Sequence, residues 1–509
     1  MPVEAASGPG QRAVVIGGGF GGMAAALRLR AKGYRVTLID RCQRLGGRAQ
    51  VFERDGFRHD AGPTVITAPF LFDELFALFG RNRADFVEFL PLNPWYRFQF
   101  ADGGRFDYGG AVEDTLREIR RIAPADERGY LRLLETSKAI FEVAFGELAD
   151  QPFHRFPALL RQLPRLLRLR SYRTVWQVVS AHLRDERLRR AFSIQPLLLG
   201  GNPFDTTSIY SLIHYLERRD GVHFARGGIG ALVDALGRLL DETGVTVRLG
   251  TTVAAIRTRD GAVAGVRLEN GEELTSDIVV SDADPLYLYT WLLPTTAQSI
   301  ACRLKVAHAR LSMGLFILFF GSRQAYPDVA HHTIWLGQRY RELLADIFTH
   351  QRLAEDFSLY IHRPTATDPS FAPPGQDSFY VLAPVPNLQA GIDWDAEAPK
   401  LRDRIVAALE RTLLPGLRDN MVADFYLTPR DFESAYLSVA GAGFSLAPLF
   451  RQSAWFRFHN RAEGPRNLYL VGAGTHPGAG LPGVLSSAKV LDRLVPAASP
   501  GPPVPTARG

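Results

Sequence analysis

The sequence is poor in cysteine. Only two cysteines occur among 509 residues, Cys42 and Cys302. They lie far apart and show neither metal-binding nor redox spacing. The scarcity excludes a disulfide framework and favours a reducing compartment, and we predict no metal site.

The sequence also lacks a long hydrophobic run. No stretch of about 18 apolar residues occurs, so no transmembrane helix is predicted. The most apolar run, residues 311–320, is too short to span a membrane, and we interpret it as a buried strand. The first ten residues carry an acid and no apolar core, so no signal peptide is predicted. Residues 1–11 and 496–509 are predicted to be disordered tails.

The composition is otherwise that of a globular protein, with 46% hydrophobic and 22% charged residues. The length predicts two domains or more. The net charge of +6 indicates attraction to an anionic surface, either a membrane or a nucleic acid.

The most informative stretch lies near the amino terminus. An apolar strand is predicted at residues 13–16, followed by the glycine-rich segment 17–22 and a helix at 23–31. A second strand at 34–39 ends at Asp40. This is the strand–turn–helix–strand setting that a G-x-G-x-x-G motif needs to bind a dinucleotide.

Each glycine of the motif has a physical role. Gly17 allows the tight turn, Gly19 allows close approach of a pyrophosphate, and Gly22 lets the helix pack on the strand. The helix N-terminus provides N–H groups and partial positive charge for phosphates. Asp40 lies where an acid accepts a hydrogen bond from a ribose hydroxyl. We interpret the neighbouring Cys42 as a bystander.

Residues 151–190 form a basic segment interleaved with leucine. The segment contains ten arginines and only two acidic residues, Asp185 and Glu186, which gives it a charge of +8. A basic amphipathic helix of this kind is typical of an interfacial membrane anchor. Nucleic acid is disfavoured because no binding motif accompanies the charge. The alternative is a solvated charged face over a helical subdomain.

A second glycine-rich turn follows near the carboxyl terminus. A strand is predicted at 468–471, then the turn 472–474 and a helix that runs to Lys489. The pattern predicts a discontinuous nucleotide domain that the carboxyl terminus completes. The region between, residues 300–460, is predicted to be a second α/β unit, with strands at 314–320, 379–384 and 424–427 and a helix at 400–413.

The chain resembles the bacterial-type phytoene desaturases of the FAD-dependent amine oxidase and desaturase superfamily. The resemblance covers roughly residues 13–490 and rests on these motifs: VVIGGGFGG, LGGRA, DAGPTVIT, LLLGGNPF, FARGGIGAL, LAPVPN and LVGAGTHPGAGLPGV. It implies an α/β fold with a Rossmann-like FAD-binding domain, a mixed-sheet substrate domain and a helical membrane-contacting subdomain. We assign residues 12–70, 222–298 and 462–495 to the FAD-binding domain. Residues 71–148 and 299–461 are assigned to the substrate domain, and residues 149–221 to the helical subdomain.

The resemblance also implies the cofactor-binding residues. They are Gly17, Gly19, Phe20, Gly21, Gly22, Asp40, Arg41, Gly46, Gly47, Arg48, Gly62, Pro63, Thr64, Val253, Gly472, Ala473, Gly474, Pro482, Gly483 and Val484. His59 and Asp60 are the first titratable groups expected near the flavin. We favour the alternative that they are satisfied polar groups at a strand end. No catalytic side chain is assigned, because the flavin carries the chemistry.

The implied activity is the stepwise desaturation of 15-cis-phytoene to neurosporene or lycopene, with hydride transfer to FAD and oxygen or a quinone as final acceptor. The expected location is peripheral, on the cytoplasmic side of the cell membrane, and no nucleic-acid partner is expected. Alternatives are a carotenoid isomerase, a desaturase of another carotenoid, a flavin amine oxidase, and a prenyl-binding protein like the GDP-dissociation inhibitors. The intact LGGRA segment and both glycine turns disfavour the last, because a protein without flavin does not need them.

Overall fold

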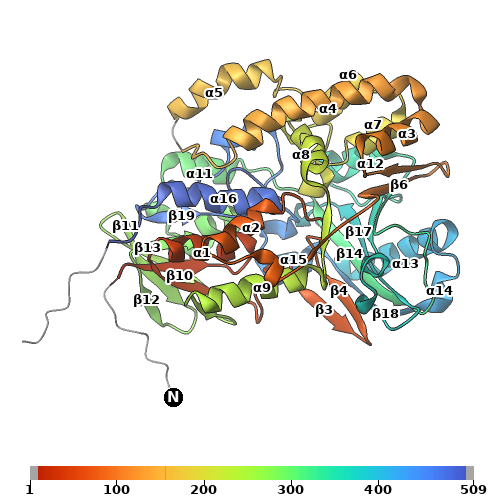
Figure 1. Ribbon diagram of the computed structural model, residues 1–509. Coiled ribbons are helices and arrows are strands. Elements are labelled where there is room, and N and C mark those ends of the chain that lie inside the picture. Colours follow the sequence, from red (N-terminus) through yellow and green to blue (C-terminus); the bar gives the residue numbers. More distant parts are fainter. Residues whose placement is uncertain (1–9, 155, 500–509) are drawn as a thin grey trace, which may run out of the picture.

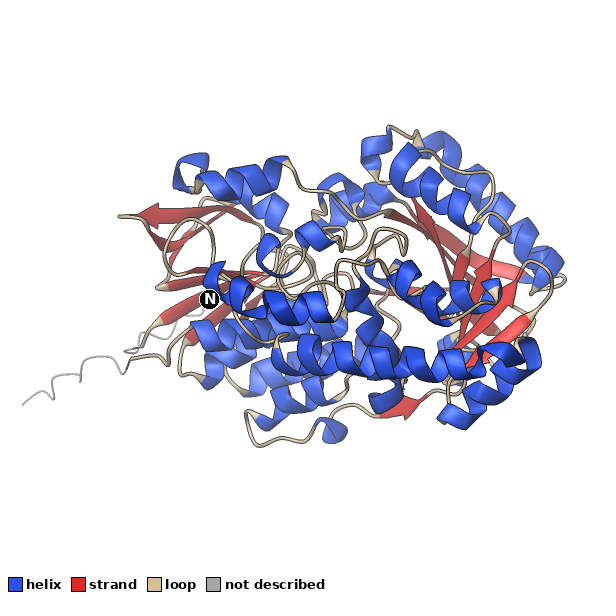
Figure 2. Ribbon diagram, turned by 90° about the horizontal axis from the view of Figure 1, so that it is seen from above, coloured by secondary structure: helices blue, strands red, loops and turns tan. Residues whose placement is uncertain are grey.

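The computed structural model describes residues 10–154 and 156–499. Two large sheets lie at opposite ends of an elongated molecule, with helices between and around them (Figures 1 and 2). The tail predictions for residues 1–9 and 500–509 fall outside the described residues. Within the described part of the carboxyl-terminal tail, the Ala498 N–H donates to the carbonyl of Lys32 at 2.8 Å.

The first sheet is parallel and has the order β19-β13-β1-β2-β9. Its strands come from both ends and the middle of the chain: β1 (Arg12–Ile16), β2 (Arg35–Ile39), β9 (Thr246–Arg248), β13 (Ile278–Ser281) and β19 (Leu468–Leu470). β13 is inserted between β1 and β19. The carboxyl-terminal segment therefore completes the sheet that the amino-terminal segment begins.

Each face of this sheet buries a separate apolar cluster. One face packs against the helices α1 (Phe20–Ala31), α2 (Phe70–Ala77), α9 (Gly228–Glu242) and α16 (Leu481–Leu494). The other packs against an antiparallel sheet made of β10 (Val253–Arg259), β11 (Ala262–Leu268) and β12 (Glu273–Thr275). Burial on both faces explains why β1 and β13 are continuous apolar runs.

The second sheet is mixed and has the order β18-β14-β17-β16-β15-β6-β7. Its strands are β6 (Tyr96–Phe100), β7 (Arg105–Tyr108), β14 (Gly314–Ser322), β15 (His332–Leu336), β16 (Leu359–His362), β17 (Asp377–Val385) and β18 (Met421–Leu427). β15 runs parallel to β6, and the other pairs are antiparallel. Two short ribbons pair β3 (Val51–Arg54) with β4 (Phe57–Asp60) and β5 (Phe89–Pro91) with β8 (His223–Ala225).

Helices cover both faces of the mixed sheet. The outer face packs against α13 (Trp394–Thr412) and α14 (Leu417–Asn420). The inner face packs against a helical layer of α3 (Val112–Ile122), α4 (Glu127–Phe141), α6 (Val175–His182), α7 (Glu186–Phe192) and α12 (Tyr340–Ala345). The remaining helices are α5 (Phe156–Arg168), α8 (Leu212–Asp220), α10 (Pro285–Tyr287), α11 (Ile300–Ala307) and α15 (Pro429–Tyr436).

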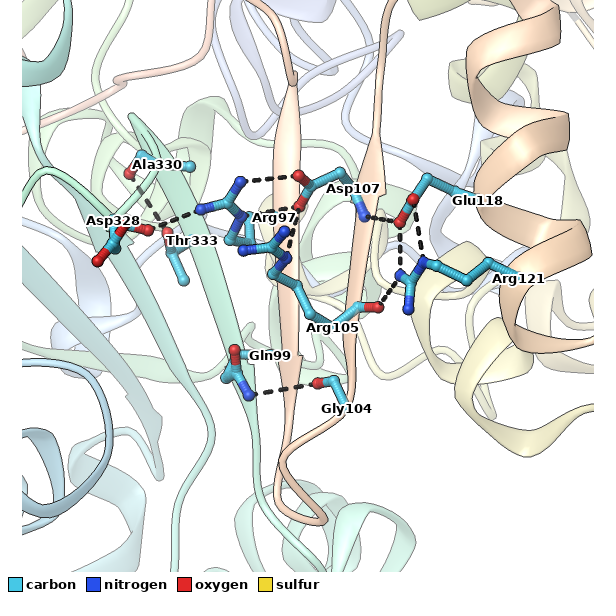
Figure 3. A network of polar contacts seen from close by, with 10 residues as sticks. All are labelled: Arg97, Gln99, Gly104, Arg105, Asp107, Glu118, Arg121, Asp328, Ala330 and Thr333. Atoms are coloured by element: carbon cyan, nitrogen blue, oxygen red, sulfur yellow. Dashed lines mark hydrogen bonds and ion pairs between the residues drawn. The ribbon is translucent and has the colours of Figure 1, made fainter.

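A polar network fastens the β6–β7 edge of the mixed sheet to α3 (Figure 3). Arg97 donates two hydrogen bonds to the carboxylate of Asp107, at 2.8 and 2.7 Å. The Asp107 N–H in turn donates to Glu118 of α3 at 3.2 Å, and Glu118 pairs with Arg121 at 2.6 Å. A bidentate arginine–carboxylate pair fixes geometry better than a single ion pair, so it holds the hairpin in place.

Most predicted elements occur close to the predicted positions. The strands expected at 314–320, 379–384 and 424–427 are β14, β17 and β18, each longer than expected. The first helix begins at Phe20 rather than residue 23, because the helix starts inside the glycine motif. The basic segment 151–190 is divided into α5, α6 and α7, because Arg170 has a positive φ of 54° and Thr174 caps α6. The domain boundaries stay an interpretation.

The described helices bear on the prediction that no segment spans a membrane. None of them combines the length and the apolarity needed to cross a bilayer.

Both cysteines are free.

Candidate functional site

The first glycine turn joins β1 to α1 at the carboxyl edge of the parallel sheet. Gly17 has φ of +98°, a conformation that glycine adopts without strain. A Cβ on Gly22 would lie 1.8 Å from the carbonyl oxygen of Gly17, so a side chain there would collide with the turn. These two positions let α1 begin directly above the turn, where its N-terminus faces the cavity described below.

Asp40 directly follows β2, lies beside this turn and is almost fully buried. Its carboxylate accepts hydrogen bonds from the N–H of Gly18 at 2.5 Å and from the N–H of Cys42 at 2.7 Å. A carboxylate can accept about four hydrogen bonds, so both oxygens keep capacity for another donor. The predicted ribose contact is therefore compatible with this position. The neighbouring Cys42 lines the cavity, and burial raises the pKa of its thiol to about 11, which leaves it unreactive at neutral pH.

A second glycine pair, Gly46 and Gly47, packs directly on the first glycine turn. The Gly46 N–H donates to the carbonyl of Gly18 at 2.9 Å, and a Cβ on Gly47 would lie 3.2 Å from Cα of Gly19. Arg48 follows and donates to Ser438 Oγ at 2.6 Å. Burial lowers the pKa of its guanidinium, while Asp284 and Asp282 act in the opposite direction. The arginine stays charged, because arginine has one of the highest side-chain pKa values.

Two acids for which the sequence predicted no role, Asp282 and Asp284, stand at the end of β13. A Cβ on Gly21 or Gly472 would lie 2.3 Å from Oδ1 of Asp282, so this carboxylate lies between the two glycine turns. Burial raises its pKa to about 7 and also raises the pKa of Asp284. Oδ2 of Asp284 finds no partner in the described part of the chain. Acids at the carboxyl end of a parallel strand are a signal that could have identified this pair.

A buried arginine, Arg457, donates hydrogen bonds to the backbone of the carboxyl-terminal turn. The Arg457 guanidinium is 1% exposed and donates to the carbonyls of Thr475 at 2.9 Å and Ala473 at 2.6 Å. It also donates to the carbonyl of Gln452 at 3.2 Å. Arg457 thus fixes residues 473–475, of which Ala473 and Gly474 line the cavity, although no motif in the sequence pointed to it.

One cavity of about 310 Å³ joins these parts. The predicted residues that line it are Gly17, Gly19, Phe20, Asp40, Arg41, Gly46, Gly47, Arg48, Gly62, Pro63, Val253, Ala473, Gly474 and Val484. The remaining predicted residues do not line it: Gly21, Gly22, Thr64, Gly472, Pro482 and Gly483. At the end next to the mixed sheet, the wall is formed by residues that were not predicted, including Leu315, Tyr380, Leu382, Phe432, Tyr436 and Phe444.

His59 and Asp60 do not line this cavity. His59 Nδ1 lies 3.0 Å from Ser378 Oγ, and Asp60 accepts from the Ile229 N–H at 2.9 Å. Burial lowers the pKa of His59 to about 4 and raises that of Asp60 to about 6. Nε2 of His59 and Oδ1 of Asp60 have no hydrogen-bond partner in the described part of the chain, so the favoured interpretation, polar groups satisfied at a strand end, holds for only one polar atom of each side chain.

The residues present fit a dinucleotide. The backbone of both glycine loops faces the cavity without side chains, a helix N-terminus points at it, and Arg48 offers positive charge. Thr251 and Thr252, which precede β10, and Val253, its first residue, also line the cavity. The fold and this site define a dinucleotide-binding protein.

Comparison with known proteins identifies the group. Residues 20–490 match the model of the family "Flavin containing amine oxidoreductase". The chain is 47% identical over 482 residues to a lycopene-forming phytoene desaturase of Pantoea ananas, covering 94% of this chain and 98% of that protein. It is 43% identical over 502 residues to a neurosporene-forming phytoene desaturase of Rhodobacter capsulatus, covering 97% and 96%.

Solved structures share the fold at low sequence identity. An oxidoreductase from Methanosarcina mazei superposes with a TM-score of 0.66 at 16% identity, covering 95% of this chain and 99% of that one. Putrescine oxidase bound to putrescine gives 0.65 at 14% identity, covering 95% and 98%. The chain therefore belongs to the flavin-containing amine oxidoreductase family, and within it to the bacterial phytoene desaturases.

Proposed function

We propose that this chain is an FAD-dependent desaturase that converts 15-cis-phytoene to neurosporene, lycopene or both. The observation that carries the proposal is the 43–47% identity, over nearly the whole length, to desaturases that form these two products. Similarity at this level extends across the substrate region as well as the nucleotide motifs. The apolar end of the cavity, with Leu315, Leu382 and Phe444, suits a hydrocarbon.

When bound, FAD supplies the electron sink for the hydride that leaves one carbon, while the neighbouring carbon loses a proton and a C=C bond forms. The residues of the chain bind and orient the hydrocarbon. Leu315 and Phe432 are 5% and 4% exposed, and a hydrocarbon bound against them would displace water from this end of the cavity. Phe432 and Phe444 line the same end, where aromatic rings would stabilise positive charge that develops on an allylic carbon. Tyr380 keeps its proton there, because burial raises its pKa.

The alternative function that has a different class of substrate, an amine, is that of an amine oxidase. The likeness to putrescine oxidase, at 14% identity, extends to the fold alone. The same apolar wall would also suit a carotenoid isomerase or a desaturase of another carotenoid. Incubation of the purified protein with FAD and 15-cis-phytoene in liposomes, followed by pigment chromatography, separates these cases. Neurosporene or lycopene supports the proposal. Untouched phytoene overturns it, and peroxide formed from an added amine identifies an oxidase.

We further propose that α5 and its surroundings contact a membrane surface. Leu160 and Leu167 of α5 are 51% and 53% exposed, and Tyr172 beyond it is 60% exposed. In Figure 1, α5 lies at the edge of the molecule. Arg161, Arg165 and Arg168 alternate with these leucines. Exposed apolar side chains beside arginine favour an anionic lipid interface, which holds the carotene substrate.

The exposed apolar side chains continue onto elements near α5. Ile300 and Leu304 of α11 are 70% and 56% exposed, and Phe450 and Phe456 are 39% and 40% exposed. Lys305 of α11 donates to the carbonyl of Trp455, which ties α11 to the Ala454–Phe456 turn. We call Leu160, Leu167, Ile300, Leu304 and Phe456 the apolar rim. This rim would allow the protein to sit on one leaflet without a spanning helix.

A further inference from the structure

Three buried histidines meet inside the mixed sheet, and none of them lines the cavity. His332 opens β15 and His362 ends β16, and the two are directly opposite in the antiparallel register. His331 precedes β15 and turns its ring to the same point. Their exposed fractions are 5% for His331, 0% for His332 and 1% for His362. His331 and His332 are adjacent, but His362 follows only 30 residues later, which is no ligand spacing, so the sequence predicted no metal site.

The spacing of the rings suits a common ligand. The ring centroids are separated by 4.6 Å for His331–His332, 4.8 Å for His331–His362 and 5.4 Å for His332–His362. Three imidazoles on one tetrahedral zinc ion, with Zn–N bonds of about 2.0–2.1 Å, place their centroids about 5.2 Å apart. One nitrogen from each ring lies within 4.8 Å of the others. Small rotations of the side chains would bring these atoms to bonding distance.

Hydrogen bonds orient two of the rings. His331 Nδ1 lies 2.6 Å from Thr367 Oγ1, and His332 Nδ1 lies 2.7 Å from the hydroxyl of Tyr360. In metal sites, a ligating histidine characteristically uses its second nitrogen in this way, which fixes the tautomer and aims the free nitrogen at the metal. Thr367 and Tyr360 are placed to play this role.

The other nitrogens are left without partners. Nε2 of His331, Nε2 of His332 and both nitrogens of His362 have no hydrogen-bond partner among residues 10–154 and 156–499. A buried polar atom without a partner costs about 1–3 kcal/mol. Several such atoms in one buried cluster indicate a ligand that satisfies them together.

The electrostatic surroundings also allow a cation. Burial keeps the pKa of all three imidazoles well below the usual value, so they are neutral and keep their lone pairs. The nearby guanidinium of Arg363 is 3.6 Å from the carboxylate of Asp377, which compensates its charge. Tyr96, whose ring lies 5.8 Å from that of His332, donates to the buried carboxylate of Glu217 at 3.0 Å.

We propose that His331, His332 and His362 form a binding site for one divalent transition-metal ion of the zinc type. Three neutral imidazoles are the ligand set that zinc and its neighbours prefer, with a fourth position for water. The ion ties β15 to β16. Through Tyr360 it also supports Thr64, whose Oγ1 lies 2.5 Å from the Tyr360 hydroxyl and which follows Gly62 and Pro63 of the cavity wall. The role is structural and does not depend on the identity of the substrate.

Cobalt binding to the full-length protein tests the site directly. The protein is dialysed against a chelator, and Co²⁺ is then titrated while visible absorption is recorded. We expect one Co²⁺ per chain with the intense bands of tetrahedral coordination, and displacement by one equivalent of Zn²⁺. A folded wild-type protein that shows no such bands overturns the proposal.

Matched variants separate the site from adventitious binding. H362N should abolish the cobalt bands, whereas H350N, which changes an exposed histidine, should leave them unchanged. Y360F keeps the ring but removes the hydrogen bond to His332, and should weaken binding by about 10–100-fold. Equal cobalt spectra in wild type, H362N and Y360F would overturn the proposal. None of these readouts involves desaturation, so failure of the proposed function would leave them unaffected.

Discussion

Oδ1 of Asp282 would lie only 2.3 Å from a Cβ placed on Gly21, so the Asp282 carboxylate packs against the N-terminus of α1. The same oxygen stands equally close to a Cβ placed on Gly472. The residue thus joins the two glycine turns, although they are more than 400 residues apart in sequence. An acid here competes with the phosphates that a helix N-terminus binds.

Asp282 should make cofactor binding and stability depend on pH. The usual pKa of this carboxyl is 3.8, and burial raises it to about 7 in the folded chain. Between these values the folded chain retains a proton that the unfolded chain has released. The free energy of unfolding therefore falls as pH rises from about 4 to about 7, by up to about 1.4 kcal/mol for each pH unit. Chemical denaturation of D282N across this range should show a flatter profile.

The same ionisation should weaken FAD binding. As pH rises through about 7, Asp282 becomes negative beside the expected pyrophosphate, so wild-type affinity should fall. D282N should bind FAD more tightly and lose most of this dependence. Fluorescence titration with FAD at several pH values measures both. A D282N curve that parallels the wild-type curve would show that another group is responsible.

Gly22→Ala should disrupt the first turn. The added Cβ would lie 1.8 Å from the carbonyl oxygen of Gly17, so the turn must shift. We expect a loss of stability of about 1–3 kcal/mol and loss of flavin during gel filtration. Gly146→Ala is the control, because its Cβ would meet nothing nearer than 3.8 Å. Retention of flavin by the Gly22 variant would contradict the assignment of this turn.

Arg457→Met should destabilise the carboxyl-terminal turn. The change leaves the carbonyls of Thr475, Ala473 and Gln452 without their donor, at a cost of about 1–3 kcal/mol for each buried group. Thermal unfolding should show a clearly lower midpoint, and FAD affinity should fall as well. Arg461→Met, at an exposed position, should leave both unchanged. If the two variants behave alike, Arg457 does not support the turn.

Leu160→Glu combined with Leu167→Glu should weaken binding to anionic liposomes. Each leucine contributes about 1.5–3 kcal/mol when its side chain is buried, so the pair should reduce binding at least about tenfold in a sedimentation assay. Both side chains are about half exposed, so FAD binding should not change. Leu249→Glu, at a position 37% exposed on another part of the surface, serves as the control. Undiminished sedimentation of the double variant would exclude α5 from the contact.

The sequence predicted the parts of the site that are local in the chain. Gly17, Gly19 and Gly22 lie within one turn, so their spacing carries the geometry. Asp40 follows the next strand and is placed by the same unit. The pairing of β19 with the amino-terminal sheet was also predictable, because a second glycine-rich strand–turn–helix repeats the first pattern.

The parts that were missed depend on long-range packing. Arg457 acts on backbone carbonyls, which no side-chain pattern reveals. The partner of Arg48 is Ser438, 390 residues away. His332 and His362 meet only because β15 and β16 pair in one particular register. The apolar cavity wall uses Leu315 and Leu382, which the sequence cannot distinguish from ordinary core residues of two apolar strands.

The most direct test of the account is an anaerobic single turnover. The FAD-loaded protein is mixed with 15-cis-phytoene in liposomes without oxygen or quinone, and visible absorption is followed together with pigment chromatography. We predict that the flavin absorption bleaches and that one new C=C bond appears in the carotene for each flavin reduced. Isomerised carotene with no bleaching, or bleaching by an amine but not by phytoene, would contradict the central claim.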